Sequence, residues 1–135
     1  MTIHQIMERL QKNIKPYEEY VVDDEVMQAM NSISNAEELV KPILELIGNN
    51  ATVDFGTPGY LVHFVESFYN KGYEELLIQS VIKTPTPYNI WLLHRCYNNV
   101  KDTKHNDYKT IAMELKNSDT TPTEVKEQID FYDWD

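Results

Sequence analysis

The sequence predicts an all-α protein, and three observations support that fold class. Apolar side chains recur every three or four residues in one segment after another, which is the spacing of one helix face. Glycine, which turn-rich β structure uses often, occurs only 4 times in 135 residues. Pairs that mark helix N-termini precede several of the apolar segments. No segment alternates apolar and polar residues over several positions, so we expect little or no sheet.

Seven segments carry the helical spacing, beginning with Ile3, Ile6, Met7 and Leu10. We expect helices around residues 3–14, 39–47, 61–68, 73–81, 90–97, 108–115 and, with a weaker pattern, 125–132. Between the first two, residues 17–22 are compatible with an extended segment and residues 24–32 with a further short helix.

The helix boundaries carry their own signals. The expected starts are Ser34-Asn35-Ala36-Glu37, Thr57-Pro58, Thr86-Pro87 and Thr121-Pro122, and the expected stops are Gly48-Asn49, Asn70-Lys71-Gly72, Thr84-Pro85 and Asn98-Asn99. The connections between the third, fourth and fifth expected helices are only a few residues long, so we expect these helices to be antiparallel neighbours. We therefore expect one helical domain, residues 1–135, with six or seven helices packed as antiparallel hairpins, either HEAT-like or as an irregular bundle.

The net charge of −10 is concentrated in the two ends of the sequence. Residues 1–50 and residues 118–135 each carry −5, whereas residues 51–117 are neutral. An acidic field repels nucleic acids and anionic membranes and attracts basic proteins. The alternative interpretation is that the acidity only keeps the domain soluble. The densest basic cluster, Lys101, Lys104 and Lys109, is interrupted by Asp102 and Asp107 and is typical of a solvated loop. We expect neither nucleic acid nor a membrane as partner.

The cysteine content and the hydrophobic pattern favour the cytoplasm. The single cysteine, Cys96, gives no disulfide framework, which suits a reducing compartment. The first residues do not resemble a signal peptide. No apolar stretch approaches the roughly 20 residues that a membrane span needs.

The sequence offers little for catalysis, and we expect no enzyme, no metal and no cofactor. His63 and Glu66 are three residues apart on one expected helix, but no second copy of the pair completes a metal site. His94 and Cys96 point about 100° or more apart on a helix, so Cys96 is interpreted as a small buried hydrophobic residue. No phosphate-binding loop or serine elbow is present. An enzyme that uses His63 and Glu66 is a weaker alternative than the two protein-binding functions considered below.

Two acidic segments rich in aromatic residues are the candidate partner-binding sites. Tyrosine and tryptophan are typical anchors of protein interfaces, and carboxylates can steer a basic partner. The aromatics of the second segment either dock on the body of the protein or form an acidic patch for a partner. The candidate residues are Tyr17, Glu18, Glu19, Tyr20, Asp23, Asp24 and Glu25 in the first segment, and Asp130, Tyr132, Asp133, Trp134 and Asp135 in the second.

Residues 54–66 (DFGTPGYLVHFVE) and 83–95 (KTPTPYNIWLLHR) resemble a known family. They are similar to small bacterial immunity proteins of polymorphic toxin and contact-dependent growth inhibition systems. The resemblance implies a helical cytoplasmic protein that binds and neutralises a cognate toxin domain, which we expect to be basic. The Thr, Pro and Gly residues of these blocks are interpreted as turn and cap residues, and Trp91 as a core residue. The alternative function is a helical adaptor or regulatory module whose protein partner is not a toxin.

Overall fold

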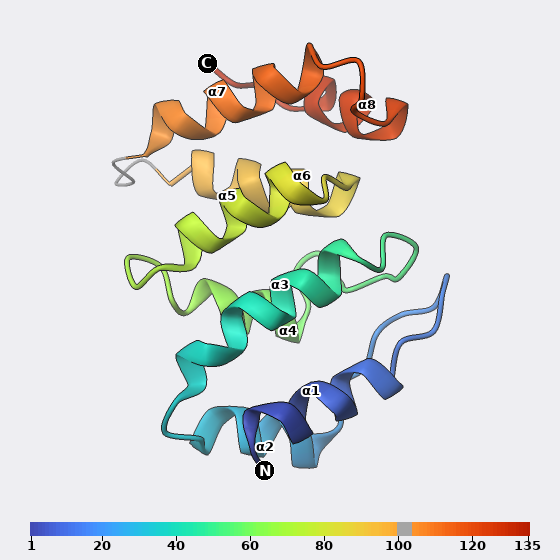
Figure 1. Ribbon diagram of the computed structural model, residues 1–135, viewed down its shortest axis with the longest axis vertical. Coiled ribbons are helices and arrows are strands. Elements are labelled where there is room, and N and C mark those ends of the chain that lie inside the picture. The colour runs from blue at the N-terminus through green and yellow to red at the C-terminus, as the bar shows by residue number, and fades with distance from the viewer. Residues whose placement is uncertain (100–103) are drawn as a thin grey trace. The chain divides into compact units, whose positions relative to one another are not determined.

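The computed structural model describes residues 1–99 and 104–135, and these residues are mainly helical (Figure 1). Among the described residues, eight α-helices and one 3-10 helix form, and the β structure is a single isolated bridge between Glu19 and Asp54. The prediction of an all-α protein is confirmed. The expected count of six or seven helices is too low, because residues 24–32, which carried a weak signal, also form a helix. The basic-cluster residues Lys101 and Asp102 lie outside the described residues.

The chain divides into two compact units, Met1–Tyr73 and Glu74–Asp135, which we call the N-terminal and C-terminal units. The N-terminal unit contains α1 (Ile3–Lys12), α2 (Asp24–Ser32), the 3-10 helix η1 (Ala36–Leu39), α3 (Val40–Gly48) and α4 (Tyr60–Glu66). Helix α1 contacts α2, η1 and α3, and α3 contacts α4. The core of this unit includes Ile6 and Leu10 of α1, Met30 of α2 and Ile43 of α3.

The C-terminal unit contains α5 (Tyr73–Lys83, whose first residue lies at the boundary), α6 (Pro87–Tyr97), α7 (His105–Lys116) and α8 (Thr123–Phe131). Helix α6 packs against both α7 and α8, and α7 also contacts α8. Ile90 and Leu93 of α6, Tyr108 of α7 and Ile129 of α8 are fully buried. Helix α6 is therefore the centre of this three-helix core.

The helix boundaries agree with the sequence better at the stops than at the starts. Thr86 caps α6 as expected: its hydroxyl accepts from the Asn89 N–H at 3.1 Å, and the Asn89 side chain accepts from the Thr86 N–H at 2.8 Å. The other three expected starts form no side-chain cap of this kind. Helix α4 begins at Tyr60, two residues after Pro58, and α8 begins at Thr123, directly after Pro122. Helices α3, α5 and α6 end at the predicted stops, at Gly48, Lys83 and Tyr97.

Two side chains singled out in the sequence have different environments. Cys96 is fully buried, which confirms its interpretation as a small core residue. Trp91 was expected in the core but is only half-buried. Its ring lies under the Arg95 guanidinium, whose carbon is 4.9 Å from the ring centroid, and beside the Tyr88 ring. An amphipathic ring covered by a cation accounts for this position at the surface. No helix in the described ranges is long and apolar enough to cross a membrane.

Candidate functional site

The predicted partner-binding residues lie at two places, one in each unit. The first acidic segment, residues 17–25, connects α1 to the first turn of α2 in the N-terminal unit. The C-terminal segment, residues 130–135, includes the end of α8 and the residues after it. Each is therefore treated as a separate surface.

The first half of the acidic segment is held as a short extended stretch against residues 52–54. The Tyr17 N–H donates to the Thr52 carbonyl (2.9 Å), and the Tyr20 N–H donates to the Asp54 carbonyl (2.7 Å). The Asp54 N–H in turn donates to the Glu18 carbonyl (3.2 Å). Tyr17 adopts a left-handed φ of 65°, which costs a non-glycine residue about 1–2 kcal/mol. These bonds leave the Tyr17 side chain 84% exposed.

Tyr20, in contrast, is half-buried on the body of the N-terminal unit. Its hydroxyl donates to the Leu10 carbonyl at 2.5 Å, and its ring centroid lies 5.2 Å from that of Phe55. Burial, and secondly the charge of Asp23, raise the pKa of Tyr20 well above its ordinary value. Tyr20 therefore connects α1 to the extended stretch and presents little of its ring to solvent.

The carboxylates of the acidic segment fall into two groups. The Arg9 guanidinium lies 3.5 Å from Asp23 and 3.6 Å from Glu25, and the Asn13 amide donates to Asp23 at 3.3 Å. Glu18, Glu19 and Asp24 are exposed and form no ion pair with any residue that the structure describes. The unneutralised charge is therefore concentrated on these three residues.

A groove of about 280 Å³ runs beside the extended stretch. Its lining is mostly apolar and comes from residues 19–22, from Met27 of α2 and from residues 55–61, apart from Thr57. Gly59 belongs to this wall, and only glycine fits there because a Cβ would lie 2.0 Å from the Phe55 carbonyl oxygen. The Tyr60 hydroxyl donates to Asn31 Oδ1 at 3.1 Å. Partial burial of this hydroxyl raises the pKa of Tyr60. An apolar groove thus borders the free carboxylate of Glu19.

The C-terminal segment docks on the body of its own unit. Trp134 is only 6% exposed, and its indole Nε1–H donates to the Ile129 carbonyl at 2.9 Å. Its ring lies 4.8 Å from the His94 ring and 5.1 Å from the Tyr97 ring, both on α6. The aromatics of this segment were expected either to dock on the body of the protein or to form a patch for a partner. Trp134 docks on the body of its own unit.

His94 and Tyr97 hold the residues around Trp134. His94 Nε2 lies 2.9 Å from the Asp133 carbonyl oxygen, and its ring stacks on Tyr132 with centroids 4.4 Å apart. The Tyr97 hydroxyl donates to the Asp135 carbonyl oxygen. Burial, followed by the charges of Asp135 and Asp133, raises the pKa of Tyr97.

The remaining acidic and aromatic residues of this segment differ in exposure. Asp130 forms an ion pair with Lys116 at 2.5 Å, whereas Asp133 and Asp135 are exposed and form none with the described residues. Tyr132 is half-buried and its hydroxyl accepts from Gln128. Phe131, which the sequence interpretation passed over, is 79% exposed. Phe131 is two residues after the buried Ile129 and therefore lies about 200° around the helix from it, a spacing that could have indicated its exposure from the sequence.

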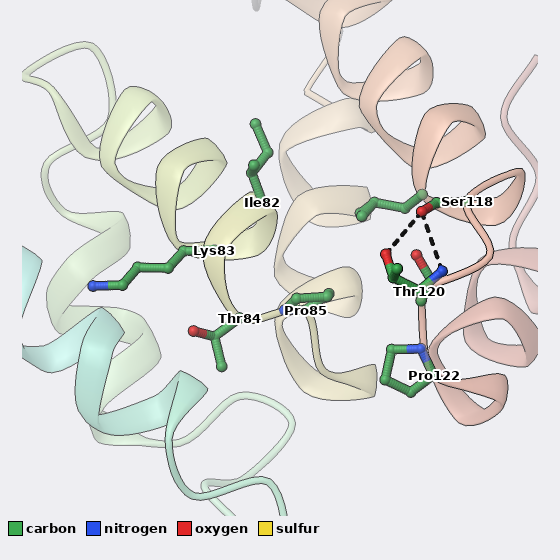
Figure 2. Close-up of a pocket in the computed structure, with 9 residues that line it drawn as sticks. Ile82, Lys83, Thr84, Pro85, Ser118, Thr120 and Pro122 are labelled. Carbon is green, nitrogen blue, oxygen red and sulfur yellow. Dashed lines mark hydrogen bonds between the residues drawn. The ribbon is translucent and has the colours of Figure 1, made fainter.

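A second pocket, of about 540 Å³, lies in the C-terminal unit between the α5–α6 and α7–α8 connections. Ser118 Oγ lies 3.0 Å from Thr120 Oγ1 and accepts from the Thr120 N–H at 3.4 Å (Figure 2). Lys83 extends away from these hydroxyls (Figure 2). The described lining residues thus place no charged group beside the hydroxyls, and the pocket indicates no particular ligand.

His63 and Glu66, the pair singled out in the sequence, both lie on α4. His63 is exposed on α4, and Glu66 accepts a hydrogen bond from Tyr69 at 3.4 Å. No group of three His, Cys, Asp or Glu side chains in residues 1–99 and 104–135 is arranged to hold a metal ion.

Comparisons with protein-family models, with curated proteins and with solved structures found no match to this chain.

Proposed function

We propose that this chain is a non-catalytic protein that binds a basic protein partner through its acidic surfaces. The observation that carries the proposal is the coincidence of exposed aromatic side chains with acidic segments. Tyr17 and Phe131 are the two strongly exposed aromatic residues in the described chain, and each lies among carboxylates. Exposed aromatics supply interface anchors, and unpaired carboxylates accelerate the capture of a basic partner.

The specific form of the proposal is a bacterial cytoplasmic immunity protein that neutralises a cognate toxin. The resemblance of residues 54–66 and 83–95 to immunity proteins supports it, as does the acidity of both units. The N-terminal unit carries eleven acidic against five basic residues, and the C-terminal unit eleven against seven. Inhibition would come from covering the active site or the substrate groove of the toxin.

The contact residues proposed are those of the two acidic segments, with roles that follow their environments. Glu18, Glu19 and Asp24 in one unit, and Asp133 and Asp135 in the other, supply free charge. Tyr17 supplies an exposed anchor. The anchor roles of Tyr20, Tyr132 and Trp134 stay predictions, because each of these side chains also contacts the body of its own unit.

We also propose that consecutive helices pack as antiparallel hairpins within the C-terminal unit. The Tyr97 ring at the end of α6 stacks on His105 at the start of α7, with centroids 4.0 Å apart. This contact, together with the packing of α6 against α7, supports opposite directions for the two helices. A rigid helical body of this kind suits a protein that presents preformed surfaces to a partner.

The second candidate function is an adaptor or regulatory module with a non-toxin partner. The same exposed aromatics and free carboxylates would serve it equally well. The identity of the neighbouring genes separates the two functions, since a toxin gene directly upstream supports immunity and an operon of metabolic genes supports the adaptor.

A growth-rescue experiment tests the immunity proposal. Each gene that flanks the gene of this chain is expressed alone and then together with this chain. We expect one flanking product to arrest growth when expressed alone and to be tolerated in the presence of the chain. Rescue should weaken in the Tyr17→Ala variant and persist in Ile82→Ala, because Ile82 is also exposed but lies outside both acidic segments. If no flanking product arrests growth, or if the chain rescues none, the immunity proposal is wrong.

A further inference from the structure

The extended stretch at residues 18–21 has one backbone edge paired with Asp54. Within the described chain the opposite edge is open at Glu19 and at the Val21 N–H, while the Val21 carbonyl accepts from Asn13 Nδ2 at 3.4 Å. The Glu18 carbonyl and the Tyr20 N–H both bond to Asp54. Because successive residues of an extended chain direct their backbone groups to opposite sides, the N–H and carbonyl of Glu19 point away from Asp54. Neither of these groups, nor the Val21 N–H, has a hydrogen-bond partner among the described residues.

The same stretch borders the apolar groove and carries an exposed apolar side chain. Residues 19–22 form one side of the groove of about 280 Å³. Phe55 and Leu61 are buried in its lining, while Val21 is 66% exposed beside it. A volume of this size accommodates one or two apolar side chains rather than a large ligand.

The carboxylates near the groove indicate which kind of segment binds there. Glu19 belongs to the groove, Glu18 precedes it, and neither carboxylate has an ion pair in the described chain. Asp54 is exposed directly across the bridge, where one of its carboxylate oxygens accepts from the Gly56 N–H at 2.9 Å. Lysine and arginine side chains on an added strand would lie next to the carboxylates of Glu18 and Glu19, and Asp54 adds negative charge one strand further away.

We propose that residues 18–21 form the docking edge for an extended, basic segment of the partner protein, which adds as a strand and places an apolar side chain in the groove. Main-chain hydrogen bonds to Glu19 and to the Val21 N–H would supply affinity, and the groove and the carboxylates would supply specificity. The inference rests on the proposed function in that the partner is a basic protein, and it adds the site, the conformation and the side-chain pattern of the bound segment.

A defined peptide tests the proposal on the full chain. The probe is the capped peptide acetyl-Arg-Val-Arg-Val-Arg-amide, titrated into the ¹⁵N-labelled protein and followed by amide chemical shifts. We expect shifts concentrated at residues 18–21 and 54–61, including a downfield shift of the Glu19 amide as its N–H gains an acceptor. The control peptide acetyl-Glu-Val-Glu-Val-Glu-amide should cause no shifts there.

Two variants at one position separate the backbone contribution from the charge. Glu19→Pro removes the outward N–H while leaving the bonds of Glu18 and Tyr20 to Asp54, and Glu19→Gln removes only the charge. We expect Glu19→Pro to bind the basic peptide about fivefold more weakly than Glu19→Gln, which corresponds to one neutral hydrogen bond. The amide spectrum of each variant first establishes that it is folded. Should the proline variant not fold, the Glu19 amide shift of the unsubstituted chain decides the question.

The outcomes distinguish this inference from the proposed function. If growth rescue succeeds but the basic peptide shifts residues elsewhere, or shifts none, the docking edge is wrong and the immunity function stands. If the peptide binds at residues 18–21 with the expected variant effects while no flanking product is rescued, the docking edge stands and the immunity function is wrong. Equal affinities of Glu19→Pro and Glu19→Gln would overturn strand addition.

Discussion

The docking of Trp134 gives the most quantitative prediction, for the variant Trp134→Ala. A buried aromatic side chain removes about 150–250 Å² from water, which is worth roughly 4–6 kcal/mol at about 25 cal/mol per Å². The alanine side chain keeps part of this burial free energy. The residues next to position 134 that are no longer held each regain about 1 kcal/mol in conformational entropy. With the lost hydrogen bond to Ile129 included, we expect the free energy of unfolding to fall by about 3 kcal/mol.

Urea unfolding of the full chain measures this change. Both tryptophans of the sequence, Trp91 and Trp134, lie in the C-terminal unit, so tryptophan fluorescence reports that unit and Trp91 continues to report it in the variant. Trp134→Phe keeps an aromatic ring but loses the indole donor, and should cost an intermediate amount. Phe131→Ala is the matched control, expected within about 0.5 kcal/mol of the unsubstituted chain because Phe131 is exposed. Equal stabilities of Trp134→Ala and Phe131→Ala would refute the docked segment.

Three further predictions concern the body of the protein. Thr86→Ala should lower the free energy of unfolding by about 1 kcal/mol in urea titrations, because it removes the buried cap of α6. The Cys96 thiol should react with a thiol reagent only after unfolding, and rapid labelling of the folded chain would contradict its burial. The raised pKa values of Tyr20 and Tyr97 mean that unfolding releases protons above pH 10, since the unfolded state ionises there while the folded state stays protonated. The free energy of unfolding should therefore fall as the pH rises beyond about 10, and a rise between pH 9 and 11 would contradict the burial of these hydroxyls.

Helical periodicity predicted the fold class because it reflects burial directly. Ile6 and Leu10, and likewise Ile43 and Ile47, are four residues apart, and all of them are buried in the structure. The helix starts were harder to predict, since a Thr-Pro pair can cap a helix, as at Thr86, or belong to the turn before it, as at Thr57. The same residue types are favoured in a backbone turn and in the first turn of a helix, and only the tertiary context decides which of the two forms.

The two acidic segments were found from composition, but the division of roles within them was not. Tyr17 and Tyr20 both stand beside carboxylates in the sequence, but their side chains differ in the structure. The Tyr20 hydroxyl donates to the Leu10 carbonyl, whereas the Tyr17 hydroxyl forms no hydrogen bond with the described residues, and sequence spacing does not indicate this difference. Among the carboxylates, the pairing of Asp23 and Glu25 with Arg9 depends on how α1 and α2 pack. The groove beside residues 19–22 depends on the approach of residues 55–61, which sequence spacing cannot show.

The association rate with the partner identified by growth rescue tests the central claim most directly. It is measured at low salt and at about 0.5 M salt, where charges more than a few ångströms apart are screened. The double variant Glu18→Gln/Glu19→Gln, which removes free carboxylates, should slow association several-fold at low salt and match the unsubstituted chain at high salt. The double variant Asp23→Asn/Glu25→Gln changes the net charge equally but removes carboxylates already paired with Arg9, and should slow association much less. Equal effects of the two double variants, or no effect of either at low salt, would contradict the claim that the free carboxylates of residues 18–19 guide the partner.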